Sequence, residues 1–177
     1  EATGGAIFFD NYGRMTEIRE RLSYFPEDIR LKRIAGNLLI MAQSGQYNYM
    51  RCLKHNEPEA AQFAVTEFVK ATLKTFFLLK RKYMPFYKWS FRALRAIPDT
   101  QELAEKLSFL ILSDNSDNVT TDVKYDTIEE TASYIINELQ NENMTKAICG
   151  DLEKHAYSVN DSISDPMIRS LNIFETV

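Results

Sequence analysis

The sequence has 177 residues, with 25 acidic and 21 basic side chains and a formal net charge of −4. This length fits one domain, and 45% hydrophobic residues can supply a globular core. No hydrophobic run approaches the roughly 20 residues of a membrane-spanning helix, so we expect no membrane partner.

The N-terminal stretch Gly4–Asp10 is an apolar run between a glycine pair and an acidic residue, which predicts one short strand. No second strand is predicted, so we expect its pairing partner in a preceding domain. The chain begins at Glu1 rather than Met, and we expect it to be a piece of a longer protein. A short charged helix is predicted at 14–23.

Two long helices, at about 27–55 and 59–83, are predicted to form an antiparallel spine. Pro26 and Pro58 stand at their starts, and apolar residues recur along both at helical spacing. The short break between them favours packing of the two helices side by side.

The middle of the first long helix is unusually polar. One interpretation is that Gly45 lets another helix approach closely. The other is that Gln43, Gln46 and Tyr47 form the polar wall of a cleft, with Arg51 one turn further along.

On the second long helix, Glu67, Lys74 and Arg81 lie seven residues apart. Such a stripe is usually a solvated face. Glu67 is, however, the last acid before Asp99, so it would lie among cations. If it faces a cleft, it is the best candidate for a general base in the chain.

The most distinctive stretch is a basic and aromatic bend around Pro85. Eight Lys or Arg lie between residues 70 and 95, whereas residues 99–177 carry 16 acids and five bases, a sum of −11. The residue before a proline avoids the α conformation, so a helix should end and another restart here. Such a bend can bind an anion and stack a flat ring. The candidate binding residues in it are Lys80, Arg81, Tyr83, Tyr87, Lys88 and Trp89. The alternative is that the cations only solvate a helix end and interact with its dipole.

Beyond Pro98 the sequence predicts helices at about 99–112, 126–139, 145–159 and 165–171. Capping-box patterns begin at Asp99 and Asp126. The polar segment 114–126 lacks the pattern of a calcium loop and is interpreted as a linker between two halves. The whole is expected to be all-α, an up-and-down bundle of seven to eight helices plus the N-terminal strand.

Three segments carry a resemblance to a known family: FDNYGRMTEIRERL, YFPEDIRLKRIAGNLLIMAQSGQYNYMRCL and FFLLKRKYMPFYKWSFRAL. They resemble helical domains of unknown function that follow a nucleotidyltransferase domain in bacterial proteins. The resemblance covers about residues 4–97, and its specific part is the KRKYMPFYKW box. More distantly, the chain is similar to the helical domain of antibiotic nucleotidyltransferases, which helps to hold the acceptor and in some members lends a carboxylate base.

The resemblance implies that residues 1–13 are the tail of a preceding nucleotidyltransferase-like domain and that 14–177 form the helical domain. Catalysis would need Gly-Ser and Asp-x-Asp to hold Mg²⁺ and phosphates, and neither motif is present here. We therefore expect no cofactor in this domain, while Mg²⁺ and a nucleoside triphosphate serve the parent protein. The bend would bind a nucleotide or small anionic acceptor, opposite a wall of Gln43, Gln46, Tyr47 and Arg51.

A second hypothesis makes the same bend an interdomain or homodimer interface, anchored by Trp89 and Tyr83, without a ligand. Sequence-specific DNA binding is not expected, because no recognition-helix pair stands out and the acidic C-terminal part would repel a duplex. Two lone cysteines, Cys52 and Cys149, are typical of reduced thiols in a cytoplasmic protein.

Overall fold

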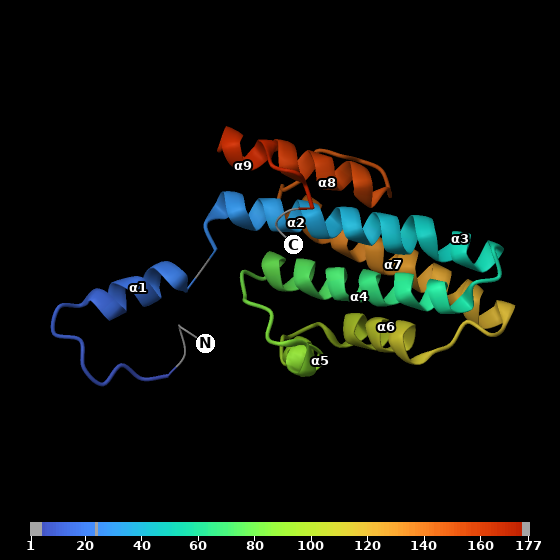
Figure 1. The fold of residues 1–177 in the computed structure, drawn as a ribbon, viewed down its shortest axis with the longest axis horizontal. Coiled ribbons are helices and arrows are strands. Elements are labelled where there is room, and N and C mark those ends of the chain that lie inside the picture. Colours follow the sequence, from blue (N-terminus) through green and yellow to red (C-terminus); the bar gives the residue numbers. More distant parts are fainter. Residues whose placement is uncertain (1–4, 24, 175–177) are drawn as a thin grey trace.

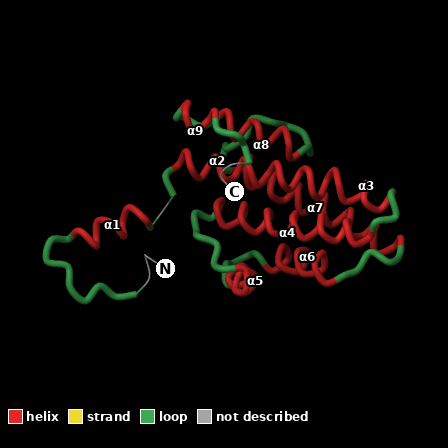
Figure 2. Tube along the Cα trace, in the orientation of Figure 1, coloured by secondary structure: helices red, strands yellow, loops and turns green. Residues whose placement is uncertain are grey.

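The computed structural model describes residues 5–23 and 25–174. In chain order its helices are α1 (Arg14–Leu22), α2 (Glu27–Met41), the π-helix η1 (Ala42–Asn48), α3 (Tyr49–Lys54), α4 (Pro58–Leu79), α5 (Tyr87–Arg95), α6 (Gln101–Leu112), α7 (Asn118–Asn141), α8 (Leu152–Asp161) and α9 (Pro166–Ser170). Helices and loops make up this part of the chain, and the fold is all-α (Figure 1, Figure 2). Because α2, η1 and α3 run on without a break, the ten segments of the described residues form eight rods. That number agrees with the prediction.

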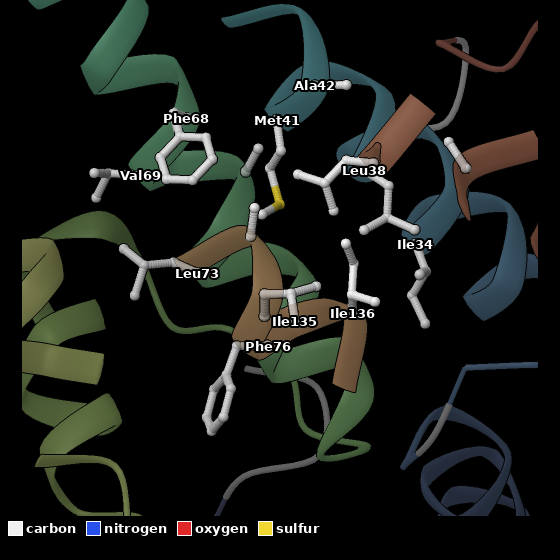
Figure 3. Close-up of a cluster of buried hydrophobic side chains, with 14 of the residues drawn as sticks. Ile34, Leu38, Met41, Ala42, Phe68, Val69, Leu73, Phe76, Ile135 and Ile136 are labelled. Carbon is white, nitrogen blue, oxygen red and sulfur yellow. The ribbon is translucent and has the colours of Figure 1, made fainter. Parts of the chain in front are cut away.

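The bundle is organised around α2, which packs against α4 on one side and α8 on the other (Figure 1). Most of α2 is buried, because neighbours cover it on several sides. Figure 3 shows side chains of α2, α4 and α7 gathered in one cluster, among them Leu38, Phe76 and Ile135. Each fully buried side chain of this size contributes roughly 1.5–3 kcal/mol relative to its exposed form. The predicted antiparallel spine is therefore the actual centre of the fold.

The predicted N-terminal strand is wrong for the described residues 5–10; Gly4 lies outside them. Instead of pairing, the segment loops back on α1. The Asp10 carboxylate accepts hydrogen bonds from the backbone N–H and the hydroxyl of Thr16, both at 2.8 Å, which lower the pKa of Asp10. Phe8 and Phe9 are 96% and 79% exposed. Helix α1 buries none of its residues and stands beside the bundle (Figure 1).

The predicted linker at 114–126 is also wrong, because α7 begins at Asn118. The cap is Asp117, whose side chain accepts the Thr120 N–H at 2.8 Å, and not Asp126, which lies exposed within the helix. Lys124 is fully buried and ties α7 to α4 through the Gln62 Oε1 atom at 2.8 Å. This contact needs a residue far away in the sequence, which local pattern does not reveal.

Two other helix starts differ from the predictions. Thr100 does not cap α6 with its side chain; its hydroxyl donates to the carbonyl of Leu94 at 2.7 Å, and Asp99 has a left-handed φ of 62°. The helix expected at 145–159 begins only at Leu152, with Asp151 as its cap. The segment before it is held by buried His155, whose ring lies 2.9 Å from the Thr145 hydroxyl and 2.7 Å from the Cys149 carbonyl.

Within the described residues, none of the helices combines the length and the hydrophobicity needed to cross a lipid bilayer.

Candidate functional site

The bend around Pro85 begins where α4 ends. Arg81 takes a left-handed φ of 53°, and the Lys82 N–H donates back to the Phe77 carbonyl at 2.8 Å. This is a common way to close the C-terminus of a helix. The chain then runs without helix to Phe86, because proline and the residue before it resist the α conformation. The bend turns Tyr83 towards the start of α2.

A cavity of about 250 Å³ lies between α2, α4 and this bend. Its apolar lining consists of Phe25, Phe77, Leu78, Tyr83 and Met84. Its polar lining consists of Arg33, Asn37, Lys74 and Lys82. The described lining thus contains three cations and no carboxylate, and it favours an anion.

The rings at the mouth of the cavity are held by contacts of their own. Tyr83 and Phe25 have ring centroids 4.4 Å apart, and the Tyr83 hydroxyl donates to the Leu22 carbonyl at 2.9 Å. The Arg33 guanidinium lies 4.9 Å from the centroid of the Phe25 ring. These contacts fix one apolar wall beside a positive charge.

Lys74 and Asn37 both belong to the polar lining of the cavity. Burial lowers the pKa of Lys74; the positive charges of Lys70 and Arg33 lower it further, and Glu67 acts in the opposite direction. Among the described residues, the Lys74 ammonium has no hydrogen-bond or ion-pair partner. An anion beside it would supply the missing counter-charge.

Asn37 is only 2% exposed, and its amide has one satisfied end. The Nδ2 atom donates to the Arg33 carbonyl at 2.7 Å, which fixes the orientation of the amide. The Oδ1 atom is buried and has no hydrogen-bond partner among the described residues. An unsatisfied buried acceptor costs about 1–3 kcal/mol, so a ligand that donates to it would gain affinity.

Only Tyr83 of the predicted binding residues in the bend lines this cavity. Lys80 pairs with Glu138 of α7 at 2.5 Å, which raises the pKa of Lys80. Arg81 pairs with Glu27 at the start of α2, at 3.1 Å. These two cations therefore brace the helix ends against acids of other elements.

Tyr87, Lys88 and Trp89 lie on the first turn of α5 and are exposed. Trp89 is 54% exposed, and the Arg92 guanidinium lies 5.4 Å from its ring. The three side chains are exposed at the start of α5 and are not part of the described cavity lining.

The predicted opposite wall belongs to a different hollow. Gln43, Gln46 and Tyr47 line a second cavity of about 740 Å³, formed with η1 and the segment before α8. Its other described lining includes the acids Glu129, Asp151 and Glu153. The structure therefore does not bring the polar wall and the basic bend together.

Gln46 and Arg51 have partners that explain their positions. Gln46 donates to Glu129 and to the Gly150 carbonyl, both at 2.9 Å, and accepts the Leu152 N–H at 3.0 Å, joining α7 to the start of α8. Arg51 stacks on the Tyr47 ring at 4.7 Å and donates to its hydroxyl. Both side chains support local structure.

Glu67, the predicted base, is an exposed residue of α4 that pairs with Lys70 at 2.8 Å. It is not part of either cavity lining. Its effect on the cavity is electrostatic, through Lys74.

A family model described as "Domain of unknown function (DUF4037)" matches residues 1–90. The chain belongs to this family. The described lining residues of the smaller cavity, from Phe25 to Met84, all fall within the matched part of this DUF4037 chain. No curated protein matches the chain, and no solved structure matches it. The predicted membership of a helical family of unknown function is confirmed, and the link to nucleotidyltransferases stays a prediction.

Of the nine described lining residues of this cavity in the DUF4037 chain, the sequence predicted only Tyr83 as a binding residue. The other eight were missed, and the polar ones among them are Arg33, Asn37, Lys74 and Lys82. A usable signal exists for Arg33 and Asn37, which lie four residues apart and therefore on one face of α2. The described residues contain no group of three or more His, Cys, Asp or Glu side chains that could hold a metal ion.

Proposed function

We propose that this chain is the acceptor- or nucleotide-binding helical domain of a nucleotidyltransferase-like protein. The observation that carries the proposal is the cavity between α2 and α4, where Arg33, Lys74 and Lys82 meet aromatic side chains. Cations gathered in a partly enclosed hollow raise the local concentration of an anionic ligand and bind it by charge-assisted hydrogen bonds.

The phosphate-transfer chemistry would belong to a preceding domain that holds Mg²⁺ and the nucleoside triphosphate. Residues 5–12 support this division, because Phe8, Phe9 and Tyr12 are each at least 79% exposed. Large apolar side chains gathered on a surface mark contact sites. In this proposal the N-terminal segment packs on that domain, and the helical domain presents the anionic substrate to it.

Isothermal titration calorimetry with ATP, AMP and inorganic phosphate tests the proposal on the native chain, Lys74→Met and Lys70→Met. The two lysines lie one turn apart on α4, but Lys70 is exposed and paired with Glu67. A charge-assisted hydrogen bond contributes about 1.5–3 kcal/mol, so Lys74→Met should weaken binding at least about tenfold. Lys70→Met should change it less than about threefold. Absence of binding to all three ligands, or equal losses in both variants, would remove the proposal.

The second candidate function is an interaction module, favoured by the exposed aromatic side chains at the start of α5. Phe86, Tyr87 and Trp89 are 65%, 69% and 54% exposed. Exposed aromatic residues are frequent anchors of protein interfaces. Light scattering of the native chain and of Trp89→Ala tests this function. Self-association through these side chains requires that the native chain is a dimer and that the variant dissociates. A monomeric native chain excludes it.

A further inference from the structure

The cavity between α2 and α4 also restricts the kind of anion that it can hold. We propose that its ligand is a small phosphate monoester that carries a hydroxyl or amino group, and not a whole nucleoside triphosphate. This inference rests on the proposed function and specifies its substrate class.

The arrangement of cations favours a phosphate over a single carboxylate. Arg33 comes from α2, Lys74 from α4 and Lys82 from the bend, so three positive groups approach from three elements. A phosphate monoester is mostly dianionic at neutral pH and offers three terminal oxygens. A carboxylate has one charge and two oxygens, so it matches a lining with three positive groups less well than a phosphate does.

The amide of Asn37 requires more than an anion. Its Nδ2 atom is already bonded to the Arg33 carbonyl, and its Oδ1 atom is buried without a partner among the described residues. A fully ionised phosphate has no hydrogen to donate to this oxygen. A ligand that also carries a hydroxyl or an amine within a few bonds of the phosphate would satisfy this oxygen.

The volume of this partly enclosed cavity favours a small ligand. Pockets for drug-sized ligands usually measure about 300–1,000 Å³, and this cavity measures about 250 Å³. The aromatic contact between Phe25 and Tyr83 closes one wall. A sugar phosphate or a nucleoside monophosphate is compact enough to enter in large part, whereas a triphosphate chain would extend outside.

Calorimetry at pH 7.5 on the 177-residue chain separates these possibilities. The probes are methyl phosphate, which has no donor, ribose 5-phosphate, AMP, and ATP without metal. On the native chain, ribose 5-phosphate or AMP should bind at least tenfold more tightly than methyl phosphate and at least as tightly as ATP. If ribose 5-phosphate binds more tightly than AMP, the ligand is a sugar phosphate; if AMP binds more tightly, the ligand is a nucleotide.

Asn37→Leu removes the acceptor with little change in size. It should bring ribose 5-phosphate to within threefold of methyl phosphate and leave methyl phosphate within twofold of its native affinity. If Asn37→Leu does not fold, the comparison of probes on the native chain decides. If neither ribose 5-phosphate nor AMP binds more tightly than methyl phosphate, or if ATP binds more tightly than both of them, the inference is overturned and the proposed function stands. Failure of all four probes to bind removes both.

Discussion

Lys124 gives a pH-dependent prediction about stability. Its side chain is fully buried, and the ammonium donates to Gln62 Oε1 at 2.8 Å and to the carbonyls of Ser113 and Asp114 at 3.1 and 3.4 Å. Burial lowers the pKa of Lys124 from 10.5 to about 8, against a smaller opposite effect of the Asp114 carboxylate. The folded protein therefore gives up this proton at a lower pH than the unfolded chain does.

The sign and size of the effect follow from proton linkage. Below pH 8 both states hold the proton, and the buried charge costs roughly 3 kcal/mol relative to the neutral form. Between pH 8 and 10.5 the unfolded chain binds more protons, so the free energy of unfolding rises with pH. From pH 7 to 9.5 the gain from Lys124 alone is about 2 kcal/mol.

Urea unfolding of the native chain and of Lys124→Met, followed by circular dichroism at pH 7 and pH 9.5, measures this gain. The variant loses three hydrogen bonds at both pH values, and this loss lowers its free energy of unfolding at each pH. The test is therefore how the difference in unfolding free energy between the native chain and the variant changes from pH 7 to pH 9.5. The free energy of unfolding of the native chain minus that of Lys124→Met should be about 2 kcal/mol larger at pH 9.5 than at pH 7. A difference that stays constant or falls would refute the assignment of a buried, easily deprotonated lysine.

Two further substitutions test the packing and the start of α7. A Cβ at Gly45 would lie 2.4 Å from the buried Phe68 ring and 2.9 Å from Ile128, so Gly45→Ala should cost about 1–3 kcal/mol in urea unfolding. Gly150→Ala, where nothing lies within 4 Å, is the control, and similar losses in both would contradict the close approach of α4 and α7 to η1. Asp117→Ala removes the cap of α7 and should lower the urea midpoint, whereas Asp126→Ala should not. A lower urea midpoint for Asp126→Ala but not for Asp117→Ala would instead indicate that the helix starts at Asp126.

The central part of the fold could be predicted from sequence because its signals are local. Prolines at the starts of α2 and α4 and continuous helical spacing located both rods. Gly45 fits the interpretation that it permits close helix packing. The start of α7 could not be predicted, because Val119, Thr120 and Thr121 are poor helix formers. The burial of Lys124 depends on acceptors that other elements supply.

The location of the candidate site could be predicted from the sequence, but most of the residues that line it could not. Pro85 correctly indicates the bend, and Tyr83 does line the cavity. The directions of Lys80 and Arg81 depend on Glu138 and Glu27, which are 58 and 54 residues away. The contribution of Arg33 and Asn37 depends on the register between α2 and α4, which helical periodicity alone does not define.

The most direct test of the central claim is to observe the lysines while inorganic phosphate is added. Two-dimensional ¹H–¹³C spectra report each lysine ε-methylene group, with Lys74→Arg assigning the key signal. The signals of Lys74 and Lys82 should move together and saturate, whereas those of exposed Lys54 and Lys88 should stay in place. Equal small movements of all four signals, or none at Lys74, would contradict an anion site between α2 and α4.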